Sequence, residues 1–221
     1  MPTQPVALTS DLAPRQVMRA DSGQHDIAVW RSVSGVVSAW ENRCPHRGMR
    51  LSHGFVRGES LACAYHGWHY ECSGRCHHIP AHPELEPPRT IKPTIFNVVE
   101  SGGLVWVNTN GEAVPAEIPD YLRSLRSLSF NCPVALLNLA LARARAAAPF
   151  GESWSVKVES QQPQVLSVAF TEPHHTVYFA LQQYRATKTL AHILVHEKLH
   201  TEERIGVSRW CESVRRQIEA S

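Results

Sequence analysis

Alternating apolar and polar positions in the first half of the chain predict short antiparallel strands. Residues 26–30 and 36–40 flank a Ser-Gly turn, a pattern typical of a β-hairpin. Residues 97–100 and 104–107 flank a Ser-Gly-Gly turn and predict a second hairpin. Short strands separated by glycine- and proline-containing turns indicate an antiparallel barrel or sandwich.

The pattern changes in the second half. We expect a short helix over residues 121–130, and a second over the Ala-, Leu- and Arg-rich stretch 134–148, which has high helix propensity. Strand patterns return later and predict a small antiparallel sheet formed by residues 165–171, 176–182 and 189–197. A terminal helix is expected from Thr201, because apolar residues then recur close to one helical face.

Composition and charge exclude some classes of partner. The 221 residues include 22 basic and 20 acidic side chains, a net charge of +2 that gives no reason to expect nucleic acid or an anionic membrane as partner. No apolar run reaches the roughly 18 residues that a membrane span needs, and residues 1–20 lack the apolar core of a secretory signal. We therefore expect a cytoplasmic protein, and six cysteines fit a reducing compartment.

Two short stretches, Cys44-x-His46 and Cys63-x2-His66, each combine one cysteine with one histidine, and 16 residues separate His46 from Cys63. Two cysteines and two histidines are the ligand set of a Rieske [2Fe–2S] cluster. The same four donors also suit tetrahedral zinc, but zinc sites usually group cysteine with cysteine and histidine with histidine. The mixed spacing therefore favours the Rieske interpretation.

The surrounding sequence resembles the Rieske domain of ring-hydroxylating oxygenase alpha subunits, in particular the phthalate oxygenase and vanillate demethylase branch. The matching stretches are NRCPHRGMRLSHG (42–54), LACAYHGWHYECSGRC (61–76), IPAHP (79–83) and GGLVWV (102–107). The resemblance implies that Cys44, His46, Cys63 and His66 are the cluster ligands. It also implies that the proline-rich loop after residue 79 covers the cluster. The two loops lack the extra cysteines of respiratory Rieske proteins.

This resemblance divides the chain into three parts. Residues 1–112 are expected to form a Rieske [2Fe–2S] domain, mainly β, with a cluster-binding subdomain. Residues 113–152 are expected to be a linker and helical segment. Residues 153–221 are expected to be a small α+β remnant of an oxygenase catalytic domain, so the family's catalytic domain is expected to be truncated.

No motif in the sequence corresponds to the mononuclear iron site of the family. Two histidines and a carboxylate normally hold that iron, and the spacing typical of them does not occur, so we assign no catalytic residue and expect no mononuclear Fe(II). A rearranged iron site remains an alternative, built from His192, His196 or His200 with a nearby glutamate. Tyr65, next to His66, is a candidate donor of a hydrogen bond to a cluster ligand.

The sequence therefore predicts the [2Fe–2S] component of a non-haem iron oxygenase system. Single electrons would pass from an NAD(P)H-dependent flavin reductase or ferredoxin to a mononuclear iron on a partner subunit, for hydroxylation or demethylation of a small aromatic substrate. The partner would be a full-length oxygenase subunit, or the chain would join a trimer. The alternatives are a self-contained small monooxygenase and a non-catalytic paralogue that senses redox state; whether the chain is itself an enzyme stays open.

Overall fold

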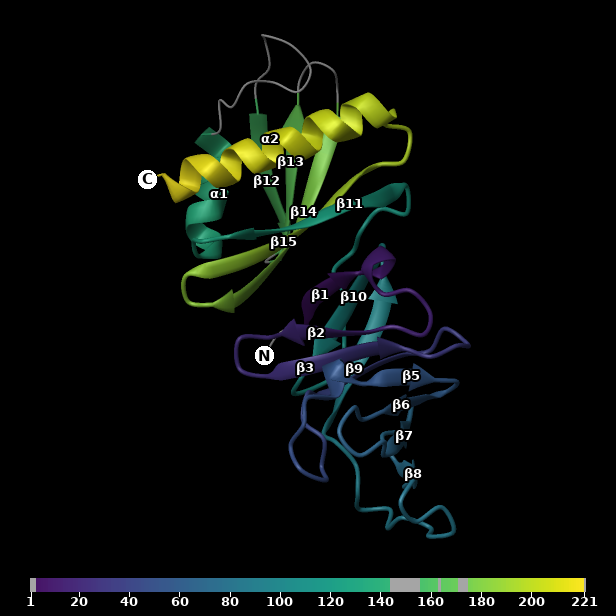
Figure 1. Ribbon diagram of the computed structural model, residues 1–221. Coiled ribbons are helices and arrows are strands. Elements are labelled where there is room, and N and C mark those ends of the chain that lie inside the picture. The colour runs from purple at the N-terminus through teal and green to yellow at the C-terminus, as the bar shows by residue number, and fades with distance from the viewer. Residues whose placement is uncertain (1–2, 144–155, 163, 171–174, 221) are drawn as a thin grey trace. The chain divides into compact units, whose positions relative to one another are not determined.

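The chain folds into two units, each with hydrophobic clusters of its own (Figure 1). The computed structural model describes residues 3–143, 156–162, 164–170 and 175–220. The first unit consists of residues 1–100 and 105–115, and the second of residues 101–104 and 116–221.

Two sheets build the first unit. The six-stranded sheet has the order β1-β10-β9-β4-β3-β2, and the four-stranded sheet has the order β5-β6-β7-β8. The strands of the larger sheet are β1 (Gln4–Leu8), β2 (Val17–Asp21), β3 (Asp26–Arg31), β4 (Val37–Glu41), β9 (Ile95–Ser101) and β10 (Leu104–Asn108). The smaller sheet contains β5 (Phe55–Arg57), β6 (Ser60–Ala62), β7 (His69–Glu71) and β8 (Cys76–His78). Two single 3-10 turns, η1 (Thr9–Asp11) and η2 (Leu51–His53), complete the unit.

Strand β3 is buried on both of its faces. Ile27 and Val29 pack into one hydrophobic cluster with strands β1 and β10, whereas Ala28 and Trp30 pack into a second cluster with the four-stranded sheet. Successive residues of a strand point to opposite faces. Because both faces of β3 are buried, its sequence is a continuous apolar run. The second cluster also contains two of the cysteines discussed below.

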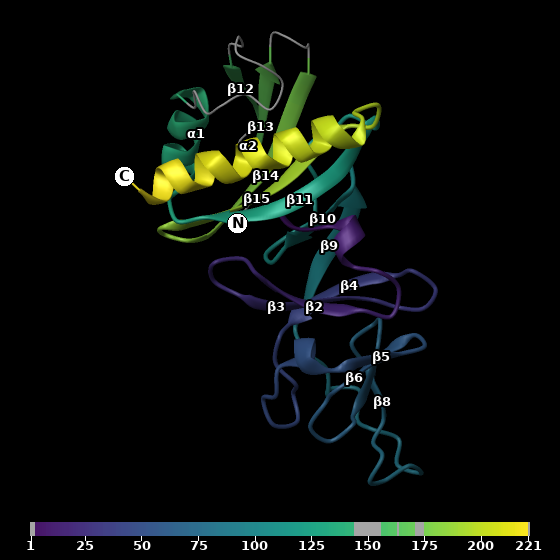
Figure 2. The same ribbon diagram turned by 45° about the horizontal axis from the view of Figure 1, so that its top comes forward.

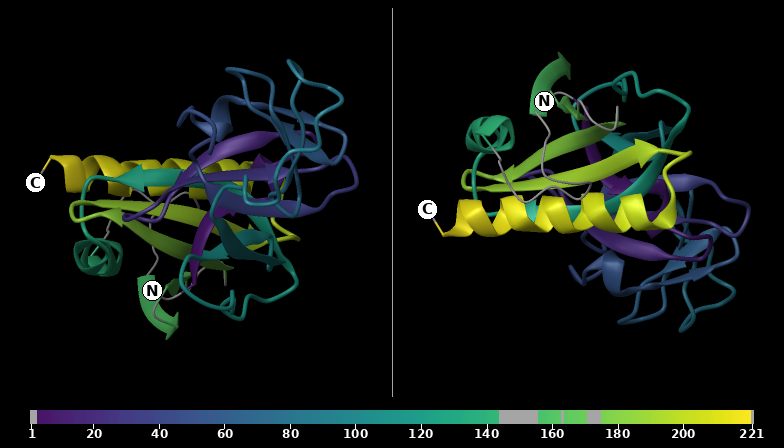
Figure 3. Two further views of the ribbon diagram at one scale, coloured as in Figure 1. Left: turned by 90° about the horizontal axis from the view of Figure 1, so that it is seen from below. Right: turned by 90° about the horizontal axis from the view of Figure 1, so that it is seen from above.

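The second unit is an antiparallel five-stranded sheet with two helices. Its strands follow the order β11-β15-β14-β13-β12. They are β11 (Leu122–Phe130), β12 (Val156–Gln162), β13 (Val165–Phe170), β14 (His175–Arg185) and β15 (Lys188–His196). Helix α2 (Thr201–Glu219) lies across one face of the sheet (Figure 2), and α1 (Val134–Arg143) lies to one side of it (Figure 3).

Helix α2 is fixed at its start and along its inner face. The N–H of His200 donates to the Glu203 carboxylate (2.7 Å), which satisfies a backbone donor at the helix start. Further along, the Trp210 ring meets Phe170 and Phe179 edge-on, at centroid distances of 5.1 and 6.2 Å. Apolar packing of this inner face, more than helix propensity, holds the helix on the sheet.

The predicted mainly β first part is confirmed, as are the terminal helix and the strands expected at 176–182 and 189–197. The strand expected at 165–171 is confirmed as far as Phe170, and Thr171 lies outside the described residues. The helix predicted over residues 121–130 is wrong, because this segment is the edge strand β11, paired with β15 through a β-bulge near Ser124. The helix predicted over 134–148 is confirmed as far as Arg143, and the remainder lies outside the described residues. Both β11 and α1 fall within the segment 113–152 and belong to the second unit; the three-part division itself stays a prediction. No helix among the described residues is long and apolar enough to span a membrane.

Candidate metal centre

The four predicted ligands lie on two turns that share one backbone hydrogen-bond pattern. The turns run from Cys44 to Met49, after β4, and from Cys63 to Trp68, between β6 and β7. In each turn the cysteine N–H donates to the carbonyl of the last residue, at 2.8 and 2.9 Å respectively. The residue before the last, a glycine, donates its N–H back to the cysteine carbonyl, at 2.8 and 3.0 Å. Each turn is thereby closed on itself at its cysteine.

Glycine is required in both turns. Gly48 and Gly67 have φ angles of 73° and 67°, in the left-handed region that side chains rarely adopt. A Cβ atom on Gly67 would also lie 3.0 Å from the Pro80 ring. The start of the proline-rich loop therefore packs directly on the second turn; that the loop covers the cluster stays a prediction.

A buried asparagine fixes the ends of the first turn. The Asn42 side chain donates to Asp26 (2.9 Å) and to the Ser52 hydroxyl (2.8 Å), and its carbonyl oxygen accepts the Ser52 N–H (2.7 Å). Asn42 precedes the turn and Ser52 follows it, so these bonds tie the two ends together. A buried polar side chain with its hydrogen bonds satisfied rigidifies its surroundings.

The two cysteines lie at the bottom of the site, each with only 3% of its surface exposed. The Cys44 Sγ is 3.1 Å from the hydroxyl of Tyr70, which is fully buried. Trp40 meets the Tyr70 ring edge-on at a centroid distance of 6.4 Å and meets Trp30 in the same way at 5.1 Å. This aromatic packing holds the Tyr70 hydroxyl on the sulfur.

The two histidines lie together near the surface. The ring centroids of His46 and His66 are 4.6 Å apart with an interplanar angle of 64°. Trp68 stacks on His46 at 4.1 Å and 8°, which leaves His46 partly buried, whereas His66 is exposed. Tyr65 leans against His66 at 3.9 Å. The two thiols are therefore buried, and the two imidazoles lie nearer the surface.

Burial controls the protonation of these donors. Burial raises the pKa of the Cys63 thiol, and hydrogen bonds from the backbone N–H groups of Tyr65 and His66 oppose this rise. Burial also lowers the pKa of His46, and the nearby His66 and Arg47 lower it further. A neutral imidazole is the form that binds a metal, and a bound metal deprotonates a thiol. The four side chains are thus suited to binding a metal group, and the backbone N–H groups of Tyr65 and His66 can donate to a Cys63 thiolate.

The donor set fits a two-iron cluster better than one zinc ion. No group of three or more His, Cys, Asp or Glu side chains is arranged to hold a single metal ion among the residues that the structure describes. A tetrahedral zinc site needs four donors around one point. A Rieske cluster needs one pair of thiolates for one iron and one pair of imidazoles for the other, and this is how the donors are paired here.

Among the described residues, His192, His196 and His200 belong to no group of three or more His, Cys, Asp or Glu side chains that could hold a metal ion. His192 lies in the buried part of β15, where its Nδ1 is 2.9 Å from the Ser127 hydroxyl. His196 stacks on Tyr121 at 4.8 Å, and His200 lies outside the strand at the start of α2. The three side chains serve different local contacts.

Sequence reasoning missed the most direct contact to a predicted ligand. Tyr65, the candidate hydrogen-bond donor, has 61% of its surface exposed and lies against His66. Tyr70 instead reaches a sulfur, because it follows the second turn on β7 and points into the core. Its place in the conspicuous stretch after His66 was the only signal in the sequence.

Comparison with known proteins supports the first unit as a distinct domain. Residues 3–98 match the family model described as the Rieske [2Fe–2S] domain. Oxidoreductase NdmD of Pseudomonas putida is 47% identical over 103 residues, which is 46% of this chain and 18% of that protein. The 4beta-methylsterol monooxygenase of Methylococcus capsulatus is 43% identical over 106 residues, which is 46% of this chain and 28% of that protein.

Solved structures share the fold over the whole chain. The structure of Pseudomonas putida NdmA has a TM-score of 0.77 at 17% sequence identity and covers 100% of this chain and 81% of that chain. Dicamba monooxygenase has a TM-score of 0.69 at 18% identity and covers 99% of this chain and 98% of that chain. At such low identity the likeness shows a common fold.

The chain therefore carries a Rieske [2Fe–2S] domain at its N-terminal side, a class of domain that implies an iron–sulfur cluster and electron transfer. The resemblance to Rieske oxygenase subunits that the motifs predicted is confirmed by relatives such as the oxygenase subunit of 3-chlorobenzoate-3,4-dioxygenase of Comamonas testosteroni, which is 36% identical over 94 residues, 42% of this chain and 22% of that protein. The aligned part spans about a fifth to a quarter of the length of the first curated relatives.

Proposed function

We propose that Cys44, His46, Cys63 and His66 hold the [2Fe–2S] cluster and that the chain is the electron-transfer component of a non-haem iron oxygenase system. When bound, the cluster takes up and releases one electron at a time. A reductase would supply the electron, and a mononuclear iron on a partner subunit would receive it.

This proposal rests on one observation: the thiol ligands are buried, whereas one imidazole ligand reaches the surface. The thiols of Cys44 and Cys63 are buried under aromatic side chains, whereas His66 reaches the surface. Trp68 covers the face of His46 and leaves His66 as the more accessible imidazole. Electrons would therefore enter and leave through the imidazole end, at His66.

The surrounding side chains set how readily the site accepts an electron. The Tyr70 hydroxyl lies 3.1 Å from the Cys44 sulfur and would donate to it when Cys44 is a thiolate ligand; a hydrogen bond to a sulfur ligand stabilises the more negative, reduced state. The backbone N–H groups near Cys63 act in the same direction. Trp68 packs on the His46 ring, and Pro80 packs on the second turn at Gly67.

Partners and substrate follow from the names of relatives and are part of the proposal. The donor would be an NAD(P)H-dependent flavin reductase or a ferredoxin, and the acceptor a full-length oxygenase subunit or another copy in a trimer. Named relatives include a methylxanthine N1-demethylase and the oxygenase component of dicamba O-demethylase. Demethylation or hydroxylation of a small aromatic compound is the reaction that this chain would serve.

The test follows reduction of the purified chain by a flavin reductase and NADH under anaerobic conditions. The wild-type protein should show the visible absorption of an iron–sulfur protein and lose part of it on reduction. Cys63→Ser should lack the absorption, because it removes one of two thiolates. Cys72→Ser, the same change at a partly exposed thiol outside the four ligands, is the matched control and should behave as wild type.

Two results would contradict the proposal. Retention of the cluster by Cys63→Ser would disprove the ligand assignment. A cluster that forms but is not reduced by any flavin reductase or ferredoxin, with or without an added oxygenase subunit, would instead favour a structural or redox-sensing role.

A further inference from the structure

The two turns that carry the predicted ligands lie in a part of the chain that is rich in arginine and poor in carboxylates. Residues 42–58 and 60–70 contain four arginines and no aspartate or glutamate. Between these ranges, the Glu59 carboxylate accepts hydrogen bonds from the N–H (3.0 Å) and the hydroxyl (2.6 Å) of Ser34, in the turn between β3 and β4. The small net charge of the chain is therefore distributed unevenly, with positive charge in excess at the candidate metal centre.

Two of these arginines lie on the first turn. Arg43 comes directly before the turn, and a Cβ atom on Gly48 would lie 3.3 Å from its Nε, so the guanidinium lies against the turn. Arg47 directly follows His46. Burial lowers the pKa of His46, and the charges of His66 and Arg47 lower it further. Both arginine side chains are exposed, so two positive charges lie at the surface within one turn of a predicted ligand.

These arginines have no carboxylate partner within the described part of the chain. Arg50, the fourth residue of this set, pairs with Asp26 at 3.1 Å. No ion pair joins a described carboxylate to Arg43, Arg47 or Arg57. Their charges are therefore not neutralised within the described structure and remain available to a partner.

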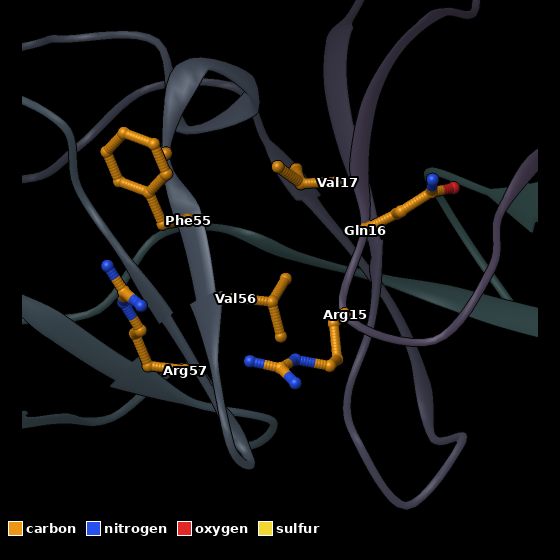
Figure 4. Close-up of a pocket in the computed structure, with 7 residues that line it drawn as sticks. Arg15, Gln16, Val17, Phe55, Val56 and Arg57 are labelled. Atoms are coloured by element: carbon orange, nitrogen blue, oxygen red, sulfur yellow. The ribbon is translucent and has the colours of Figure 1, made fainter.

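Arg57 extends the positive region beyond the first turn. Its side chain points to the opposite side of β5 from Val56 (Figure 4), and it is exposed whereas Val56 is buried. Burial lowers the pKa of His69, which begins β7 directly after the second turn. The charges of His78, His77 and Arg57 add to this shift. The field of Arg57 thus reaches the strand that follows the second turn.

The exposed imidazole of His66 lies beside apolar surface. The Tyr65 ring is 3.9 Å from the His66 ring, and 61% of the Tyr65 surface is exposed. Pro80 is also exposed, and it packs on the second turn at Gly67. An apolar centre with charged side chains near it is the usual composition of a protein interface.

We propose that this surface docks an acidic electron-carrier protein, a [2Fe–2S] ferredoxin or ferredoxin domain with carboxylates around its own cluster. The carboxylates would face Arg43 and Arg47, and the redox centre of the carrier would face His66. One electron leaves the carrier and one is taken up at the candidate metal centre, so no other reactant is needed. Opposite charges around the two centres would steer the encounter and speed association. The inference rests on the proposed function and narrows the electron donor that it names.

Isothermal titration of the cluster-loaded full-length protein with an oxidised plant-type [2Fe–2S] ferredoxin, an acidic protein, tests the docking by binding alone. Cytochrome c, a basic electron carrier, is the comparison probe. At about 20 mM salt, ferredoxin should bind at one site and about tenfold or more tighter than cytochrome c. At about 500 mM salt, ferredoxin binding should weaken about tenfold or more, because salt screens exposed charges.

Charge reversal identifies the side chains. Arg43→Glu and Arg47→Glu should each weaken ferredoxin binding about fivefold or more at low salt. Arg47→Lys keeps the charge and should bind as the wild type does. Arg185→Glu, the same change at an exposed arginine of the second unit, is the matched control and should leave binding unchanged. The visible absorption of each variant shows whether its cluster is intact, which separates loss of the site from loss of docking.

Several results would overturn the inference: no saturable binding of ferredoxin, equal binding of cytochrome c, binding that salt does not weaken, or unchanged affinity in both glutamate variants. Self-association of the chain at low salt that Arg47→Glu abolishes would also overturn it, in favour of a second copy on this surface. None of these results contradicts the proposed function, provided that the cluster forms and is reduced. A cluster that neither ferredoxin nor a flavin reductase reduces would contradict the proposed function even if ferredoxin binds.

Discussion

Tyr70 is the residue whose single hydrogen bond most directly affects a predicted ligand. Its hydroxyl lies 3.1 Å from the Cys44 sulfur, inside a fully buried aromatic group. Burial, and then Cys44 itself, raises the pKa of this phenol far above its ordinary value, so it stays protonated as a donor.

Tyr70→Phe should lower the reduction potential of the cluster. Loss of a hydrogen bond worth about 1–1.5 kcal/mol corresponds to roughly 40–65 mV for a one-electron couple. A spectroscopic redox titration measures the shift. Tyr65→Phe is the matched control, since this side chain is exposed and its ring lies against His66, and it should leave the potential unchanged. An equal shift in both variants would show that the hydrogen bond to Cys44 is not the cause.

The ligands could be predicted from sequence because each pair is local. Cys44 and His46 share one turn, Cys63 and His66 share the other, and the spacing in each turn is fixed by chemistry. The Tyr70 contact joins a strand to a distant turn, 26 residues away. No local pattern specifies which of several aromatic residues reaches the sulfur, so that contact needed the tertiary structure.

At the scale of elements, a partly buried ion pair joins β3 to β9. Arg31, with 9% of its side chain exposed, holds the Glu100 carboxylate through two nitrogens at 2.8 and 2.6 Å. The Arg31 hydrogen bonds lower the pKa of the Glu100 carboxyl below its ordinary value of 4.5. A carboxylate with a lowered pKa in the folded state stabilises the fold above the unfolded pKa.

The contribution of this pair should depend on pH. At neutral pH, Glu100→Gln should cost about 1–2 kcal/mol of unfolding free energy, reduced from the buried-pair range by solvent at the partly exposed carboxylate. The difference from wild type should shrink as the pH falls below 4.5 through the folded-state pKa. Urea unfolding across pH 3–7, at about one-unit steps, measures it. Glu117→Gln, at an exposed site, is the control; a pH-independent difference for Glu100→Gln would refute the assignment.

Helix α2 is held on its sheet mainly by Trp210. This side chain is 1% exposed and meets Phe170 and Phe179 edge-on in the core of the second unit. Trp210→Ala should destabilise that unit by about 3–5 kcal/mol, because it leaves a large cavity. Ile205→Ala, on the exposed face of the same helix, should change stability by less than about 0.5 kcal/mol. Denaturant unfolding measures both, and equal losses would show that α2 does not pack through Trp210.

Strand β11 shows why periodicity failed for one element. Leu122, Leu125 and Leu128 recur every third residue, which fits a helix better than the two-residue alternation of a strand. The β-bulge near Ser124 inserts an extra residue and shifts the phase of the strand. The segment is a strand because it pairs with β15, where Ser127 faces His192, a residue 65 positions further along the chain. The strands β13, β14 and β15 are short apolar runs rich in β-branched and aromatic residues, and could be predicted.

At the scale of the whole molecule, the chain consists of two units with separate cores. All four predicted ligands, Tyr70 and Pro80 lie in the first unit. The second unit has a helix and sheet whose fold resembles that of solved oxygenase structures. The sequence of the second unit predicted α1, α2 and the strands β13, β14 and β15, but neither β11 nor β12 nor the five-stranded order, because strand order depends on contacts distant in sequence.

The first unit should bind the cluster on its own. A fragment of residues 1–115 contains both turns and both hydrophobic clusters that support them. It should retain about two irons per chain and the visible absorption of the full-length protein. Absorption spectra and iron analysis of the fragment check this. Loss of the cluster from a fragment that remains folded by circular dichroism would show that the second unit contributes to the site.

Iron and acid-labile sulfide per chain, measured on anaerobically purified full-length protein, test the central claim most directly. The account predicts about two irons and two sulfides, with the oxygen chemistry on a partner. About three irons would contradict the electron-transfer assignment by placing a mononuclear site in this chain. One zinc per chain without sulfide would contradict the cluster itself.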